Sequence, residues 1–155
     1  MPSRRTFLAA TAAAPLVFSR ASGVSANDRL AVGFIGVGTM GRGHLGGFLS
    51  RGEVEVVTVC DVVKERLDNA KATVEKKYAD RIKSGGFKGP AAYTDFRELL
   101  AHKGLDAVVI ATPDHWHATQ TIDALKAGKH VYCEKPMTHT VDEAIAVYRA
   151  WKDSG

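Results

Sequence analysis

The chain has 155 residues, and its 21 lysines and arginines against 17 acidic residues give a formal net charge of +4. Residues 1–26 hold three of the arginines and no acidic residue, so the part that follows carries 18 basic (21 less 3) against 17 acidic residues. This near balance excludes nucleic-acid binding driven by net charge. The 129 residues from 27 onward are enough for one domain with its own hydrophobic core.

The N-terminal segment has the features of an export signal. Residues 3–8 read S-R-R-T-F-L, which resembles a twin-arginine motif, and the alanine-rich stretch 7–18 is too short to remain as a membrane-spanning helix. The small residues at 24–26 offer a cleavage site. We therefore expect residues 1–26 to be a signal peptide read by the twin-arginine export machinery, and residues 27–155 to be periplasmic or extracellular. The alternative is a disordered basic tail; no later segment is apolar enough to span a membrane.

A glycine-rich loop follows the first apolar run. Residues 30–35 predict a buried strand, and they lead directly into G-x-G-x-x-G. In this motif the first glycine permits a tight turn, the second lets the backbone approach a diphosphate, and the third lets a helix pack close to the strand. The helix N-terminus then favours the negative charge of the phosphates. We assign cofactor binding to Gly36, Gly38, Thr39, Met40 and Gly41.

An acidic residue ends the next apolar run, at 54–60. Asp61 lies twenty residues after Gly41, where a carboxylate can accept hydrogen bonds from an adenosine ribose and repel a 2′-phosphate. This arrangement favours NAD over NADP. The nearby basic residues Lys64 and Arg66 keep NADP open as the alternative cofactor. A glycine loop that only makes a turn would leave Asp61 unexplained.

The rest of the chain alternates helices and strands. Hydrophobic spacing predicts helices over 40–50, 64–78, 96–102 and 115–127, and strands over 54–60, 92–93, 106–111 and 130–133. A capping box at 140–143 opens a last helix. We expect this helix to bury Ala144, Ile145, Tyr148 and Trp151. The pattern predicts an α/β fold, a doubly wound parallel sheet (Rossmann) of order 3-2-1-4-5, and this order separates Cys60 from Cys133 as two free thiols.

In such a sheet, ligands bind beyond the carboxyl ends of the strands, where the strand order reverses. Four loops meet at that edge: 36–41, 61–62, 112–117 and 134–137. Three of the predicted loops together resemble the Gfo/Idh/MocA (glucose–fructose oxidoreductase / inositol 2-dehydrogenase) family: the glycine loop, A-T-P-D-H-W-H at 111–117 and G-K-H-V-Y-C-E-K-P at 128–136. At Asp114 the chain departs from the asparagine that many members carry.

The resemblance implies that residues 27–155 are the NAD(P)-binding Rossmann part of a larger oxidoreductase. It implies a second α+β domain, an open β-sheet that holds most of the substrate pocket. We expect this chain to be an N-terminal fragment or a truncated gene model that lacks that domain and its catalytic residues. The full-length protein is expected to be a homo-oligomer.

The resemblance also implies roles for single residues. Lys135 is the candidate catalytic residue, since a lysine there reaches the substrate hydroxyl near the nicotinamide, as hydrogen-bond donor or as base. Lys135 is also expected to contact the cofactor. Glu134 is expected to line the nicotinamide end of the cofactor or to orient Lys135. Thr112 and Pro113 border the cofactor. His117 contacts a ribose or the nicotinamide, with a packing role left open. The alternative for Lys135 is a surface residue paired with Glu134.

Several other side chains have competing interpretations. His115 and His117 suggest a metal site with Glu134 or His139, but residues two apart diverge on a helix, and we expect no metal. Trp116 either lines a substrate pocket or packs in the core. The remaining histidines are expected to have surface or packing roles: His44, His102 and His130.

Together these features predict an exported oxidoreductase that acts on a CH–OH group of a sugar or polyol. Because an exported enzyme has no access to the cytoplasmic nicotinamide pool, we expect tightly bound NAD(H), reduced by one substrate and reoxidised by a second. The first alternative is an NAD-dependent glycoside hydrolase with transient redox chemistry. The second is a dinucleotide-binding fragment that is catalytically incomplete.

Overall fold

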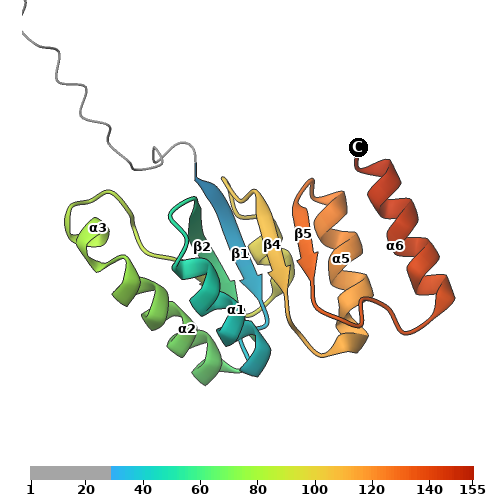
Figure 1. Cartoon of the computed structure of the whole chain (residues 1–155), viewed down its shortest axis with the longest axis horizontal. Coiled ribbons are helices and arrows are strands. Elements are labelled where there is room, and N and C mark those ends of the chain that lie inside the picture. The colour runs from blue at the N-terminus through green and yellow to red at the C-terminus, as the bar shows by residue number, and fades with distance from the viewer. Residues whose placement is uncertain (1–28) are drawn as a thin grey trace, which may run out of the picture.

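The computed structural model describes residues 29–155 and confirms the predicted fold. Five parallel strands form one sheet in the order β3-β2-β1-β4-β5, with helices beside it (Figure 1). The elements are β1 (Leu30–Ile35), α1 (Thr39–Leu49), β2 (Val54–Cys60), α2 (Lys64–Lys77), α3 (Ala79–Lys83), β3 (Ala91–Tyr93), α4 (Phe96–Leu100), β4 (Ala107–Ile110), η2 (Asp114–Trp116), α5 (His117–Lys126), β5 (His130–Cys133) and α6 (Val141–Asp153). The predicted signal peptide lies outside the described residues.

Two hydrophobic clusters cover the two faces of the sheet. Alternate side chains of the central strand β1 point to opposite faces, as in any strand. Phe34 packs in a cluster with residues of α1 and α2, whereas Ile35 packs in a second cluster with residues of α4 and α5. Helices therefore cover both faces of the central strands, which is why β1 and β4 are continuous apolar runs. Among the described residues, no helix is long and apolar enough to cross a membrane.

Most boundaries agree with the predicted ones within two residues, and two further differences concern whole elements. Residues 79–83, which carried no prediction, form the short helix α3. The helix expected over 115–127 begins as a tight 3-10 turn, η2, in which the N–H of Trp116 donates to the carbonyl of Pro113 (3.0 Å), before α5 starts at His117. The turn continues into α5, and no side chain caps the start of either helix.

The predicted buried face of α6 is wrong. Its capping box is present, but Ile145, Tyr148 and Trp151 are 42, 59 and 60% exposed, and Ala144 is only partly buried. Val147 is the residue of this helix that is buried. The reason is the position of α6 at the end of the sheet, where it lies beside α5 (Figure 1) and has one neighbour to cover it instead of a whole sheet face.

Both cysteines are free thiols, as predicted. Burial, with a smaller effect from the Asp61 carboxylate, raises the pKa of Cys60 to about 12. Burial also raises the pKa of Cys133. Since the thiolate is the reactive form, we expect both thiols to react slowly with iodoacetamide in the native protein at neutral pH and quickly in urea. Mass spectrometry of the alkylated protein measures this, and rapid native alkylation of Cys60 would contradict it.

Candidate functional site

The glycine loop connects β1 to α1 and has the close backbone approaches that its motif predicts. Gly36 has a positive φ of 84°, and a Cβ there would lie 2.8 Å from the backbone of Ala111 at the end of β4. A Cβ on Gly41 would lie 2.0 Å from the carbonyl oxygen of Gly36. Only glycine fits at either position, because the neighbouring atoms are backbone and cannot rotate away.

The first turn of α1 is suited to an anion. Its N-cap is Gly38, which offers no capping side chain, and the turn that Thr39 and Met40 begin contains no acidic residue. Its N–H groups and the helix dipole are therefore available to phosphate oxygens. Arg66 of α2 places its guanidinium 3.5 Å from where a Cβ of Gly38 would be. A positive side chain thus approaches the same backbone.

Asp61 supports this loop from the end of β2. Its side chain is 7% exposed, and one carboxylate oxygen accepts the N–H of Val37 (2.9 Å) while the other accepts the N–H of Val63 (2.8 Å). The carboxylate therefore ties the glycine loop to the start of α2. Each oxygen keeps a second lone pair for a ligand hydroxyl. Asp61 also lines the cleft beside the loop.

That cleft has a volume of about 390 Å³ and lies between the carboxyl ends of β1, β2 and β4. Its walls include the glycine loop, Arg66, Pro113 and Trp116. Trp116 is 42% exposed, so the core-packing alternative for it is wrong. Lys64 instead pairs with Asp68 (2.8 Å) on the exposed side of α2. Of the two basic residues that kept NADP open, Arg66 is the one at the cleft.

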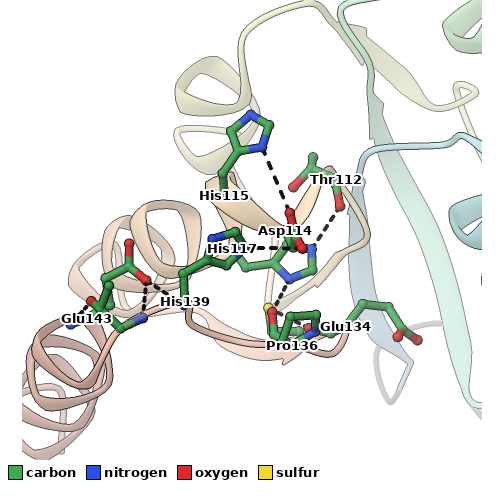
Figure 2. A network of polar contacts seen from close by, with 10 residues as sticks. Thr112, Asp114, His115, His117, Glu134, Pro136, His139 and Glu143 are labelled. Carbon is green, nitrogen blue, oxygen red and sulfur yellow. Dashed lines mark hydrogen bonds and ion pairs between the residues drawn. The ribbon is translucent and has the colours of Figure 1, made fainter.

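The loop after β4 is held by two side chains of α5. The hydroxyl of Thr112 donates to Gln120 (2.7 Å), and the carbonyl of Thr112 contacts Nε2 of His117 (2.9 Å). The other ring nitrogen of His117 contacts the carbonyl of Pro136 (2.8 Å), as Figure 2 shows. His117 is 2% exposed. Both ring nitrogens are therefore engaged within the protein, which favours the packing alternative over a direct cofactor contact.

Sequence reasoning missed Gln120, which is buried three residues after His117 on the same helix. Its position one turn after His117 on the same helix was the available signal. It also missed the role of His44, expected to be a surface or packing residue. Nε2 of His44, on α1, lies 2.5 Å from a carboxylate oxygen of Glu134 after β5. The helix of the glycine loop is thereby joined to the loop of Lys135.

Glu134 orients its own loop. Its second carboxylate oxygen accepts the N–H of Lys135 (3.1 Å), and the Tyr132 hydroxyl lies 3.4 Å from the first. The pKa of Glu134 is lowered, and the hydrogen bond with His44 is the largest cause. The Lys135 side chain is exposed, and within residues 29–155 its ammonium forms no ion pair, so the alternative of a pair with Glu134 is not seen. The Lys135–Pro136 peptide bond is cis.

The lowered pKa of Glu134 predicts a pH dependence. A depressed carboxyl pKa contributes stability above the ordinary value of 4.5, and this stability is lost as pH falls through the folded-state value. We expect the melting temperature of the native protein to fall more steeply with acid than that of Glu134→Gln. Asp95 and Asp114 also have lowered pKa values and contribute to the acid sensitivity of both proteins. The readout is therefore the difference in melting temperature between the native protein and Glu134→Gln at each pH. Parallel profiles would contradict the role of His44.

The histidines that suggested a metal site do not come together as a set of ligands in the described residues. His139 pairs with Asp114 (3.2 Å), and His115 lies 4.0 Å from the same carboxylate (Figure 2). His117 contacts backbone carbonyls instead. In residues 29–155 there is no group of three histidine, cysteine or acidic side chains that could hold a metal ion.

The parallel sheet, its glycine loop, the acid that ends β2 and the cleft at the reversal of strand order define a dinucleotide-binding domain of the Rossmann type. Residues 30–155 match the family described as "Oxidoreductase family, NAD-binding Rossmann fold", GFO_IDH_MocA. The chain belongs to this family, and the resemblance seen in its three loops is confirmed. NAD is accordingly the cofactor of the domain, and the glycine loop fits its diphosphate.

Two relatives and one solved structure show the range of the similarity. A glycosyl hydrolase family 109 protein of Shewanella pealeana is 36% identical over 120 residues, 75% of this chain and 25% of the relative. An alpha-N-acetylgalactosaminidase of Shewanella oneidensis is 37% identical over 116 residues, 72% of this chain and 24% of the relative. The chain therefore spans about a quarter of the length of the curated relatives it matches.

The similar structure is a scyllo-inositol dehydrogenase from Lactobacillus casei, solved with bound cofactor NAD(H) and scyllo-inositol. It superposes with a TM-score of 0.69 at 25% identity, over 81% of this chain and 34% of that one. The relatives thus include a dehydrogenase of a polyol and proteins named as glycosidases.

Proposed function

We propose that this protein is an exported oxidoreductase that uses tightly held NAD(H) to oxidise or reduce a hydroxyl-bearing carbon of a sugar or polyol. The observation that carries the proposal is the placement of Lys135. Its loop is held by Glu134 and by the contact between Pro136 and His117, while its ammonium is exposed at the same sheet edge as the glycine loop. A dehydrogenase bound to NAD(H) and a polyol among the similar structures supports it.

In this proposal NAD, when bound, supplies the hydride acceptor. Lys135 holds the substrate hydroxyl as a hydrogen-bond donor, or takes its proton as the carbon is oxidised. Glu134 orients the backbone of Lys135 and so belongs to the positioning of the site. Asp61 and the glycine loop bind the ribose and the diphosphate, with Thr112 and Pro113 along the cleft.

Export is part of the proposal and rests on the S-R-R-T-F-L run at residues 3–8. The twin-arginine route carries folded proteins, so the cofactor is loaded before export and then recycled by alternating substrates in a periplasmic or extracellular location. The full-length protein is proposed to be a homo-oligomer. Arg66 at the cleft makes NADP the alternative cofactor to include in every assay.

Mass spectrometry of the nucleotide that acid releases from the purified protein tests the trapped cofactor. We expect stoichiometric NAD or NADH. In a native sample of the same protein, we expect one sugar or polyol to reduce the bound NAD and a second substrate to reoxidise it. Release of no nucleotide, with none rebinding at millimolar concentration, would overturn this and favour the catalytically incomplete fragment. The assay separates tight binding from the question of which substrate is used.

A second candidate is an NAD-dependent glycoside hydrolase, favoured by the glycosidase names of the Shewanella relatives. Such an enzyme oxidises a sugar hydroxyl, eliminates the aglycone and restores the hydroxyl, so the bound NAD ends unchanged. Product analysis separates the candidates. An aryl N-acetylgalactosaminide that releases its aglycone without net oxidation supports the glycosidase, whereas accumulation of an oxidised sugar supports the oxidoreductase.

A further inference from the structure

We propose that His44 is a positioning residue that holds the loop of Lys135 in register with the helix of the glycine loop. It acts through the Glu134 carboxylate, whose two oxygens join the ring of His44 to the backbone of Lys135. The link between the two loops does not depend on the proposed function. Only its consequence for hydride transfer rests on that function.

The place of His44 on α1 brings its ring to the end of β5. His44 follows Gly41 by three residues, so the two lie on the same side of the helix. A Cβ on Gly41 would lie 2.0 Å from the carbonyl oxygen of Gly36, so this side of α1 lies against the glycine loop. In the described part of the chain, α1 packs mainly on β1, β2 and α2. The contact of His44 with the segment after β5 is therefore a separate link made by single side chains.

The Glu134 carboxylate bridges the two partners. One oxygen lies 2.5 Å from Nε2 of His44, and the other accepts the N–H of Lys135 (3.1 Å). An ionised carboxylate only accepts hydrogen bonds, so Nε2 is the donor, and a neutral imidazole with its proton on that nitrogen is sufficient. Hydrogen bonds to a charged acceptor are about twice as strong as neutral ones. His44 therefore fixes the carboxylate that in turn holds the backbone of Lys135.

Tyr132 holds the ring of His44 in place. Tyr132 lies two residues before Glu134, and alternate residues of an extended chain point to the same side. Its ring packs edge-on against the imidazole, with 5.5 Å between the centroids and an interplanar angle of 65°. Its hydroxyl lies 3.4 Å from the carboxylate oxygen that His44 contacts. The ring is thus fixed by two side chains, and with His44 and Glu134 only 24 and 13% exposed, water competes for their hydrogen bond only in part.

A purely structural role for His44 makes a different prediction. If His44 only fastened α1 to the sheet, its replacement would change stability slightly and leave the loop of Lys135 as it is. A positioning role predicts that the backbone of Lys135 loosens while the fold and NAD affinity remain. Two amide variants separate these roles. In His44→Gln the side-chain nitrogen reaches the place of Nε2, whereas in His44→Asn it reaches only the place of Nδ1 and stops short of Glu134.

Amide hydrogen exchange in the NAD-bound protein, followed by NMR, tests the link itself. We expect the N–H of Lys135 to lose protection in His44→Asn and to keep it in His44→Gln, because only the second variant still holds the Glu134 carboxylate. The N–H of Glu134 donates to the carbonyl of Ile110 (2.9 Å) and should stay protected in both, as an internal control. Unchanged exchange at Lys135 in His44→Asn would overturn the proposal. His44→Leu repeats the measurement should the asparagine variant not fold.

Single-turnover reduction of bound NAD in the natural protein tests the consequence for Lys135. We expect His44→Asn to slow this step on the order of tenfold to hundredfold, because small misplacements of reacting groups have effects of this size. His44→Gln should recover most of the native rate. NAD affinity, measured by calorimetric titration, should change by less than about twofold in both variants, since neither replacement alters the glycine loop.

His130→Asn is the matched control, because it makes the same substitution at an exposed position at the start of β5, the opposite end of the strand from Glu134. Its rate should stay within about twofold of the native rate. A native rate in His44→Asn, equal slowing in His44→Asn and His44→Gln, or a parallel loss of NAD affinity would overturn the positioning role. A wild-type protein without turnover would contradict the proposed function alone, and the exchange of the Lys135 amide would still decide whether the link exists.

Discussion

Replacement of Gly41 by alanine is expected to weaken NAD binding strongly. The added methyl would lie 2.0 Å from the carbonyl oxygen of Gly36. The backbone of Gly36 is itself held in place, because its N–H donates to the carbonyl of Cys60 in β2 (2.9 Å). Either α1 or the glycine loop must move, and overpacking of this kind costs about 1–3 kcal/mol. A free-energy cost of this size lowers the affinity for NAD on the order of tenfold to hundredfold. Calorimetric titration with NAD measures the loss.

The same helix provides a matched control. A Cβ at Gly43 meets no atom within 4 Å, and the position is exposed. Gly43→Ala should therefore raise stability by up to about 1 kcal/mol through helix propensity and leave NAD affinity unchanged. The prediction for Gly41 fails if the two variants bind NAD equally well, or if both lose binding because α1 tolerates no added methyl.

The sheet could be predicted because each strand carries its own signal. Apolar runs such as 54–60 end in turn or acidic residues, and the order follows from alternation with helices. The residue spacing Gly41 to Asp61 likewise predicted that a carboxylate stands beside the glycine loop. Its contact with the N–H of Val37 adds a structural role that the motif alone does not express.

The side-chain contacts between loops could not be predicted, because they join residues far apart in the chain. His44 and Glu134 are 90 positions apart, and nothing near either residue indicates its partner. The face of α6 was mispredicted for a related reason. Helical spacing shows which side of a helix is apolar, but the element that covers that side lies elsewhere, and in residues 29–155 Tyr148 and Trp151 remain largely exposed.

Lys135 is expected to act in the chemical step, whereas Gly41 is expected to act in NAD binding. The side chain is exposed and forms no ion pair in the part of the chain that the structure describes, so its ammonium contributes little to folding. Its backbone, by contrast, is held by the Glu134 carboxylate. A side chain that is free at its tip and fixed at its base is suited to meet a ligand. Its removal should therefore affect chemistry and spare both stability and NAD affinity.

We accordingly expect Lys135→Met to lower the rate of hydride transfer about 10²–10⁴-fold, the usual contribution of a general acid or base. Melting temperature and NAD affinity should stay near the native values. Lys135→Arg keeps a donor that does not give up its proton in proteins, so partial activity in this variant would assign a donor role, and none would assign a base. Lys126→Met, at the opposite end of α5 from His117, is the matched control. A native hydride-transfer rate in Lys135→Met, measured by single-turnover absorbance of the nicotinamide, would return Lys135 to the status of a surface lysine.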